Sequence, residues 1–273
     1  MENLEKNIQL RLLDMLEWYH NFCSNNNLRY YIIGGTMLGA VRHQGFIPWD
    51  DDIDVGMPRE DYETLLKLMR ENYDTRYIVE SIYSGNEDYI YAYAKLYDTS
   101  STLIENTRYR VKRGVYIDIF PLDGIGNTIN EAKSNFLPIQ RKINFLSARV
   151  CALNNKRKFY KNIAIIFARL IPKLIVNENM LIKKIDDLCK RYNFETSSIV
   201  GNLVGNWGER ELMERSVFGD PQLYNFENLM VFGVEKYDMY LTNLYGEYMK
   251  LPSEEKRKSH HDYILCDLYT PYK

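Results

Sequence analysis

The sequence predicts an α+β fold in which strands lie mainly in the first half of the chain and helices in the second. Between residues 28 and 120, short runs rich in isoleucine, valine and tyrosine are separated by glycine, proline and asparagine, a pattern typical of strands joined by turns. From about residue 128 onward, apolar residues recur every three to four positions over longer stretches, as in amphipathic helices. Strands and helices in separate stretches of chain favour the α+β class.

The individual elements follow from local patterns. Apolar residues at helical spacing predict a first helix over residues 3–24, which the three asparagines that follow can end. The next expected elements are a strand at 28–33, a short helix reaching Arg42, a strand at 52–57, a helix from Pro58 to about Asn72, and strands at 77–82, 90–97 and 115–120. Later helices are expected at about 128–153, 158–171, 178–192 and 236–245. We therefore predict an α+β core over residues 1–125 and a mainly helical region over residues 126–273 that packs on the core.

Composition limits the class of protein. With 273 residues, 45% hydrophobic and 26% charged, the chain is typical of an ordered globular protein. A net charge of −2 gives no indication of nucleic-acid binding. The four cysteines are far apart, which argues against a zinc knuckle or a disulfide scaffold. The N-terminus lacks a signal-peptide pattern and no apolar run is long enough to span a bilayer, so a cytoplasmic protein is expected.

Charge is nevertheless distributed unevenly. Residues 132–177 contain ten basic residues and no acidic one, whereas the rest of the chain carries 25 basic and 37 acidic residues. Within this stretch, apolar residues from Phe159 to Leu174 recur at helical spacing among lysines and arginines. Such a helix can lie on an anionic membrane surface, or it can pack on the core with a solvated basic face; the sequence leaves both interpretations open.

Two aspartates in residues 49–55 are the leading candidates for catalysis and metal binding. In a strand, Asp52 and Asp54 share one face, while Ile53 and Val55 point to the other. Two adjacent carboxylates repel each other, so one keeps its proton unless a cation intervenes. A divalent ion with oxygen ligands removes this repulsion, and Mg²⁺ (or Mn²⁺) suits a substrate phosphate.

Asp118 is the third candidate, because it interrupts the otherwise apolar strand at 115–120. Burying an unpaired carboxylate costs several kcal/mol of folding free energy. Asp118 would avoid this cost if it lay beside Asp52 and Asp54 and bound the same metal ion. Three acids on two strands can hold two ions about 4 Å apart for an in-line displacement. Asp118 is also a candidate general base for the acceptor hydroxyl.

The acidic segment has two alternative interpretations. A solvated acidic turn is the simpler one, but such turns rarely alternate with isoleucine and valine. A calcium loop is the other, since Asp50, Asp52 and Asp54 match its first, third and fifth positions. That loop needs glycine at position six and glutamate at position twelve, where this chain has Val55 and Asp61, so the calcium interpretation fails.

A glycine turn precedes the acidic segment. Gly34, Gly35 and Thr36 lie between a predicted strand and a predicted helix, where exposed backbone amides and the helix N-terminus favour a phosphate. Thr36 can cap the helix or bind the phosphate. A Gly-Gly pair is more often only a turn, and its interest here comes from lying in one strand–helix–strand unit with the aspartates.

Four further residues are candidate ligands of the donor. Arg42 suits bidentate contact with a phosphate and Lys95 suits a point contact, although a solvated surface charge is an equally good interpretation of either. His260 and His261 are adjacent and point in different directions, so they make a poor metal pair and are retained only as contacts of the donor.

Several blocks of this sequence resemble the LicD family of phosphocholine transferases, to which fukutin-related protein is also related. The most specific blocks are residues 34–43, 45–54 and 57–62. Shorter matching pieces are Lys95 and residues 102–105, 117–123, 245–249, 251–252 and 254–257. Together they cover most of the chain, with a loose match over residues 124–230.

The resemblance implies a nucleotidyltransferase fold, with a mixed β-sheet flanked by helices and with Asp52, Asp54 and Asp118 as ligands of two metal ions. Residues 1–125 would then form the nucleotidyltransferase catalytic core, and residues 126–273 would complete the site. It also implies a CDP-linked donor, CDP-choline or a CDP-alditol, and a sugar hydroxyl of a cell-surface glycan as acceptor. That glycan, such as teichoic acid, capsule or lipopolysaccharide, is expected to be lipid-linked and assembled at the inner face of the cell membrane, where the basic residues 132–177 would meet anionic lipid.

Two other functions remain as alternatives. A metal-dependent glycosyltransferase uses an Asp-x-Asp pair to hold a nucleotide sugar, but it needs neither the glycine turn nor an aspartate on a second strand. A non-enzymatic membrane- or glycan-binding module would use its aspartates only structurally, so their replacement by asparagine would leave its function intact.

Overall fold

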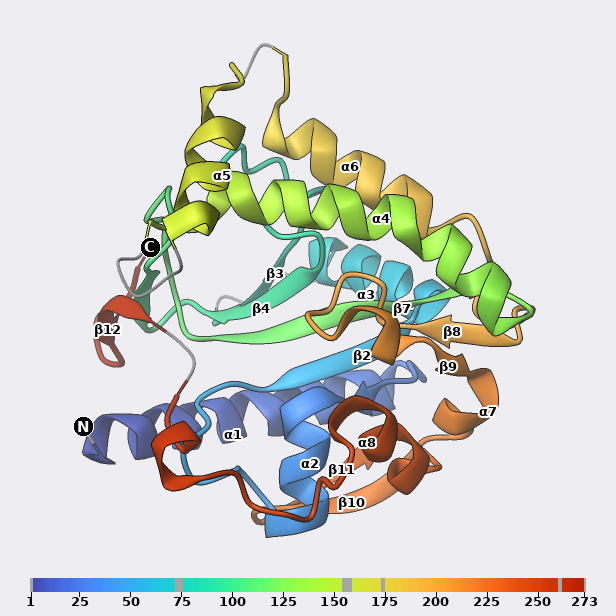
Figure 1. Ribbon diagram of the computed structural model, residues 1–273. Helices are drawn as coiled ribbons and strands as arrows, with labels where there is room; N and C mark the ends of the chain where they lie inside the picture. The colour runs from blue at the N-terminus through green and yellow to red at the C-terminus, as the bar shows by residue number, and fades with distance from the viewer. Residues whose placement is uncertain (1, 72–75, 154–158, 173–174, 260–261, 273) are drawn as a thin grey trace.

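The computed structural model describes residues 2–71, 76–153, 159–172, 175–259 and 262–272. It has the α+β architecture that the sequence predicts, with a mixed sheet between helices (Figure 1). In the part of the chain described, the main sheet has nine strands; seven of them follow the order β10-β11-β1-β2-β7-β4-β3, and β8 and β9 extend it from β7. The β1–β11 and β2–β7 pairs are parallel and the other pairs are antiparallel. A smaller sheet has the order β12-β5-β6.

The predicted N-terminal elements occur in the expected order with shifted ends, and two further strands, at residues 102–105 and 112–113, were not predicted. The helices are α1 (Glu2–Asn25), α2 (Gly34–His43) and α3 (Arg59–Glu71). The strands are β1 (Tyr31–Ile32), β2 (Asp54–Pro58), β3 (Tyr77–Glu80), β4 (Ala94–Asp98), β5 (Thr102–Glu105), β6 (Lys112–Arg113) and β7 (Tyr116–Gly126). Strand β7 is longer than expected because β8 pairs with residues 123–126, beyond the predicted end of the strand at Phe120.

The C-terminal half contains the predicted helices and several strands that the sequence did not reveal. The helices are α4 (Ile129–Val150), α5 (Phe159–Leu170), α6 (Glu178–Cys189), α7 (Arg215–Phe218) and α8 (Tyr237–Tyr245), with 3₁₀ turns η1 (Gly208–Glu211) and η2 (Glu254–Lys256). The strands are β8 (Ile199–Gly201), β9 (Met213–Glu214), β10 (Gln222–Phe226), β11 (Leu229–Gly233) and β12 (Tyr263–Asp267). The β10–β11 hairpin escaped prediction because its turn has no glycine; Glu227 takes the left-handed conformation instead, with φ of 55°.

These strands link the two predicted regions. Strand β11 pairs with β1, and β8 pairs with β7, so the main sheet includes chain from both sides of residue 125. Helices α4 and α6 pack against each other and both contact β7. In Figure 1 they form a layer above strands β4 and β7, with α5 beside them, while α1 and α2 lie below strand β2. The division into residues 1–125 and 126–273 stays a prediction.

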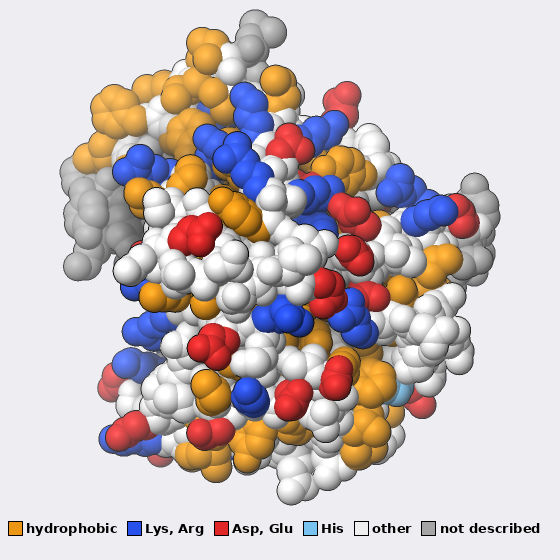
Figure 2. Space-filling view, turned by 90° about the vertical axis from the view of Figure 1, so that its right-hand side faces the viewer, with side chains coloured by type: hydrophobic (Ala, Val, Ile, Leu, Met, Phe, Trp, Pro, Cys, Tyr) orange, Lys and Arg blue, Asp and Glu red, His pale blue; other side chains and the backbone are white. Residues whose placement is uncertain are grey.

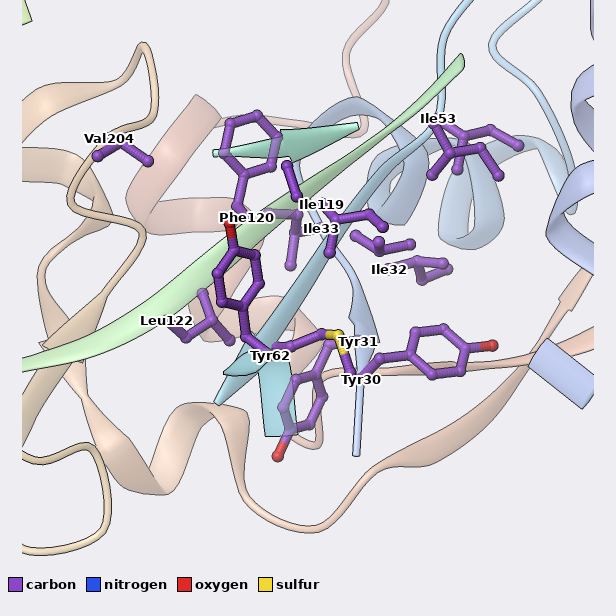
Figure 3. Packing of buried hydrophobic residues seen from close by; sticks show 14 of the residues in the cluster. Tyr30, Tyr31, Ile32, Ile33, Ile53, Tyr62, Ile119, Phe120, Leu122 and Val204 are labelled. Carbon is purple, nitrogen blue, oxygen red and sulfur yellow. The ribbon is translucent and has the colours of Figure 1, made fainter. Parts of the chain in front are cut away.

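A large core holds the central strands together. Ile53, Ile117 and Ile119 are fully buried and belong to one hydrophobic cluster with residues of β1 and β2 (Figure 3). Because side chains alternate along a strand, burial of Ile117 and Ile119 on one face turns Asp118 to the other. Among the described residues, no helix is sufficiently long and apolar to span a membrane.

Candidate active site

Three charged side chains form a row across adjacent strands. Asp54, the first residue of β2, lies opposite Asp118 in the parallel pair with β7. Lys95 of β4 lies opposite Asp118 on its other side. Residues directly opposite each other in a sheet project to the same face, so the strand register brings Asp54, Asp118 and Lys95 together. Backbone bonds from Ile33 N to Asp54 O (3.1 Å) and from Asp118 N to Ile53 O (3.0 Å) stabilise this register.

The aspartates interact strongly with one another. Burial raises the pKa of Asp54, and the nearby charges of Asp52, Asp118 and Asp50 raise it further. Burial likewise raises the pKa of Asp118 to about 6, although Lys95 opposes this shift. The structure therefore brings all three predicted aspartates into one acidic group. It differs from the prediction in that Asp52 precedes β2 instead of belonging to it.

Lys95 is a buried partner of Asp118. Its side chain is 1% exposed, and Nζ lies 2.8 Å from Asp118 Oδ1. The ammonium also lies over the rings of Tyr116 and Tyr91, 3.3 Å and 4.3 Å from their centroids, an arrangement that stabilises a desolvated cation. Both tyrosine hydroxyls donate to Glu105, which fixes the rings. The sequence makes Lys95 a candidate phosphate ligand, and that role stays a prediction; the structure shows its ammonium paired with Asp118.

Thr36 positions the first aspartate. Its side chain is buried, and its hydroxyl accepts a hydrogen bond of 2.9 Å from the backbone N–H of Asp54. It makes no capping bond at the N-terminus of α2, where Ile33 occupies the cap position. Of the two roles expected for Thr36, capping is thus wrong. The structure adds a contact with the Asp54 backbone that the sequence did not suggest.

The glycine turn allows close approach to the acids. Gly34 has a φ of 55°, a conformation that residues with a side chain rarely adopt, and a Cβ there would lie 3.3 Å from Asp54 Oδ2. A Cβ on Gly35 would lie 2.9 Å from Asp50 Oδ2. The two glycines therefore lie directly against Asp54 and Asp50, and their role in binding a phosphate stays a prediction.

Helix α8 supplies residues that the sequence reasoning missed. The hydroxyl of Tyr240 accepts the Gly34 N–H at 3.0 Å. The hydroxyl of Tyr245 would lie 3.9 Å from a Cβ on Gly34, and burial with the neighbouring charge of Asp54 raises the pKa of Tyr245. Tyr245 begins one of the blocks that resemble the LicD family, which was the available signal. No local pattern indicated that the two tyrosines would meet a turn some 200 positions earlier in the chain.

The C-terminal segment also reaches the acidic group. Ser259 donates a hydrogen bond of 2.7 Å to Asp51 Oδ1, and Asp51 and Asp52 both raise the pKa of Tyr263 in β12, after burial as the largest cause. Residues about 200 positions beyond the aspartates in the sequence thus lie beside them.

The remaining candidates are placed differently. Arg42 lies in the last turn of α2, eight residues beyond Gly34, where its guanidinium donates to the Tyr248 carbonyl at 2.7 Å and to His43 at 2.9 Å. Among the described contacts it makes no ion pair with the aspartates, so its role as a phosphate ligand stays a prediction. His260 and His261 lie outside the described residues.

The donor set fits a hard divalent cation. Asp52, Asp54 and Asp118 offer only oxygen ligands, and Asp118 Oδ1 is buried without a directed hydrogen bond despite its ion pair with Lys95. Within the described ranges, no three acidic, histidine or cysteine side chains converge closely enough to form a complete metal site. This is compatible with Mg²⁺, which proteins usually hold through one or two carboxylates together with water and substrate phosphates.

Comparison with known proteins identifies the domain that carries these residues. Residues 27–154 match the family model described as LicD/FKTN/FKRP, nucleotidyltransferase domain. Asp52, Asp54, Lys95 and Asp118 all lie within the matched range, whereas Tyr240 and Tyr245 lie beyond it.

Individual relatives extend this similarity over different lengths. The chain is 29% identical over 261 residues to the lipopolysaccharide cholinephosphotransferase LicD of Haemophilus influenzae, covering 93% of this chain and 94% of that protein. It is 53% identical over 34 residues to the ribitol 5-phosphate transferase FKRP of Homo sapiens, covering 12% of this chain and 7% of that protein. An uncharacterized protein of Rickettsia prowazekii, RP689, is 45% identical over 60 residues, 22% of this chain and 23% of its own length.

Proposed function

Because the chain belongs to the LicD family and is a transferase of a phospho-substituent, we propose that it moves phosphocholine, or a similar phospho-alcohol, from a CDP-linked donor to a sugar hydroxyl of a cell-surface glycan. The observation that carries the proposal is the row of Asp54, Asp118 and Lys95 on one face of the sheet, beside the glycine turn.

The choice of transferred group rests on the extent of each similarity. The cholinephosphotransferase matches almost from end to end, whereas the ribitol 5-phosphate transferase matches over 34 residues only. A substrate is recognised by the whole site, including α8 and the C-terminal segment, so the end-to-end relative is the better guide. Phosphocholine from CDP-choline is therefore the first candidate, and a CDP-alditol the second. The acceptor is lipopolysaccharide, teichoic acid or capsule, reached from the cytoplasmic side of the membrane.

Divalent metal is part of the proposal. Asp52, Asp54 and Asp118 would hold one or two ions of Mg²⁺ or Mn²⁺, and the metal would neutralise negative charge on the donor phosphates. Mutual repulsion among the aspartates supports this role, since a cation would relieve it.

The other tasks of catalysis, proton transfer and positioning of groups, would fall to separate residues of the site. Asp118 would accept the proton of the attacking sugar hydroxyl, because its carboxylate is held between Asp54 and Lys95. Lys95 would keep Asp118 oriented through their 2.8 Å ion pair. Thr36 would hold the Asp54 backbone, and Gly34 and Gly35 would leave room for the donor phosphates beside the carboxylates.

The proposed activity can be tested by donor hydrolysis and transfer. Purified enzyme with Mg²⁺ and membranes from the native host is expected to release CMP from CDP-choline faster than from CDP-glycerol or CDP-ribitol, and to release no UDP from UDP-sugars. Asp54→Asn should reduce turnover by about 10³-fold or more, since positioning and charge neutralisation provide most of the catalysis in phosphoryl transfer.

The matched control is Asp187→Asn, which removes the same charge from an exposed position on α6 and should leave turnover unchanged. UDP release, which an Asp-x-Asp glycosyltransferase would produce, would overturn the proposal. Full activity of Asp54→Asn would also overturn it, because the aspartates would then be structural.

A further inference from the structure

A groove lies between α4 and α6, away from the aspartates. Its volume is about 370 Å³. One part of its wall is basic, with Arg141 and Lys142 from α4 and Lys184 from α6; another part is apolar and includes Phe145 and Met180. The groove thus combines basic side chains with exposed apolar ones, and none of these residues belongs to the active site described above.

Apolar side chains continue onto the surface around the groove. Ile175 beside it is 74% exposed and Met180 is 60% exposed, while Phe167 and Leu170 of α5 are 66% and 68% exposed. In Figure 2, hydrophobic and basic side chains are intermixed over the upper part of the molecule, the part that α4, α5 and α6 occupy in Figure 1. Large apolar residues gathered on one surface usually mark a binding face.

Two of the three acids of α6 are turned away from this surface. Glu178 is buried and pairs with Arg149 Nε at 3.0 Å, and Asp186 is buried and pairs with Arg59 at 2.8 Å. Asp187 is exposed but does not line the groove. The fold therefore leaves a net positive face, in agreement with the absence of acidic residues between positions 132 and 177.

We propose that this face docks on an anionic phospholipid bilayer, with headgroup phosphates at Arg141, Lys142 and Lys184 and with Phe167, Leu170, Ile175 and Met180 inserted among the acyl chains near the surface. Apolar side chains next to a cluster of basic ones are typical of proteins that lie on a membrane surface without spanning the membrane. Each cation close to an anionic surface strengthens binding several-fold. The inserted side chains add the favourable free energy of transferring apolar surface out of water.

A second copy of the chain is a poorer occupant. A symmetric dimer formed through this face would bring the same cations of both copies toward each other, which is repulsive. The cores of protein interfaces are also depleted in charged residues, whereas here the cations line the groove itself.

The face is connected to the strands of the active site. The backbone N–H of Arg108 donates to Val150 O at the end of α4 (2.8 Å), and Thr107 forms a bridge with Cys151. These residues directly follow β5, which ends at Glu105, the acceptor for Tyr116 beside Lys95. Docking through α4, α5 and α6 would therefore hold the catalytic strands next to the bilayer, where a lipid-linked acceptor is available.

Vesicle co-sedimentation of the full-length protein tests the proposal. The protein is expected to bind vesicles of phosphatidylcholine with 30% phosphatidylglycerol, and to bind pure phosphatidylcholine vesicles much more weakly. The triple variant Arg141→Glu, Lys142→Glu, Lys184→Glu should lower the partition coefficient by at least about 100-fold, since each cation contributes roughly fivefold. Leu170→Ser with Met180→Ser should weaken binding even where the charges are intact.

Two controls distinguish docking through this face from a general effect of net charge and from loss of the transfer activity. Lys6→Glu, Lys67→Glu, Lys236→Glu makes the same change in net charge at exposed positions elsewhere and should bind vesicles nearly as well as the wild type. Asp54→Asn should bind normally, so that failure of the proposed transfer activity and failure of docking are distinguishable. Equal binding of the groove variant and this lysine control would overturn the proposal. A dimer in solution that only the groove variant dissociates would also overturn it, by assigning the face to a second copy.

Discussion

Lys95 illustrates how one residue can serve both stability and the proposed chemistry. It is buried between Asp118 and a cluster of tyrosine rings, and its ammonium is the cation 2.8 Å from the Asp118 carboxylate. A buried ion pair contributes little in itself, because desolvation offsets most of the attraction. Removing one partner is different, since it leaves an uncompensated charge in the interior.

A double-mutant cycle on this pair has a definite expected result. Lys95→Met should lower the free energy of unfolding by about 3–5 kcal/mol at pH 7, because Asp118 loses its partner. Adding Asp118→Asn to Lys95→Met should recover much of that loss, giving a coupling energy of at least about 1 kcal/mol. Urea denaturation followed by circular dichroism measures all four proteins. Strictly additive effects would mean that the two side chains do not interact in solution.

At the scale of secondary-structure elements, buried arginines join the helical layer to the sheet. Arg59 at the start of α3 donates to Asp123 of β7 at 2.7 and 2.5 Å, and to Asp186 of α6 at 2.8 Å. Arg149 of α4 donates to the carbonyls of Ala168 and Ile171, at the end of α5, at 2.7 and 3.0 Å. The planar guanidinium can bond several elements at once, which a lysine cannot do as well.

We expect Arg59→Met to destabilise the protein by about 3–5 kcal/mol, because the buried Asp123 carboxylate loses its cation and Asp186 keeps only Lys190 and Tyr83 as partners. Arg59→Lys should cost less, since it retains the charge but loses the paired geometry. Arg29→Met is the matched control. Its side chain is 41% exposed and pairs with Asp61 and Glu195, so its loss should cost no more than about 1 kcal/mol per pair. Thermal and urea unfolding distinguish these outcomes, and equal effects of Arg59→Met and Arg29→Met would contradict the role assigned to Arg59.

At the scale of the whole molecule, stability should depend on pH through Glu211. This residue is 4% exposed, and burial raises its pKa from 4.5 to about 8. The folded protein therefore holds a proton that the unfolded chain releases, and between these pH values stability must fall as pH rises. The stabilising contribution is complete below about pH 4.5 and is lost as the pH passes through about 8.

Glu211→Gln removes this titration while preserving shape. The difference in unfolding free energy between wild type and Glu211→Gln should therefore change steadily from pH 5 to pH 7, in favour of the variant at higher pH, by up to about 1.4 kcal/mol per pH unit. Glu209→Gln, at an exposed position in the same 3₁₀ turn, should show no such trend. A difference between wild type and Glu211→Gln that is independent of pH would show that the carboxyl is already ionised in the folded state.

Elements whose signal is local were predictable from the sequence. Helices α1, α3, α4 and α6 were expected within a few residues of their observed bounds, because the amphipathic repeat of a helix is contained in its own residues. Strands were less predictable. The turn of the β10–β11 hairpin contains no glycine, and β12 depends on pairing with the distant strand β5. Strand β1 has only two residues, which is too short for an alternating pattern to be recognised.

The sequence by itself determined the residue types of the candidate site: two aspartates two positions apart, a third within an apolar strand, and a glycine turn ahead of them. Only the tertiary structure decided what each side chain contacts. Strand register placed Asp54 and Lys95 on either side of Asp118, and packing of α8 brought Tyr240 to the glycine turn. The physical reason is that spacing along the chain specifies which face a side chain takes, whereas pairing between strands and packing of helices specify its neighbours.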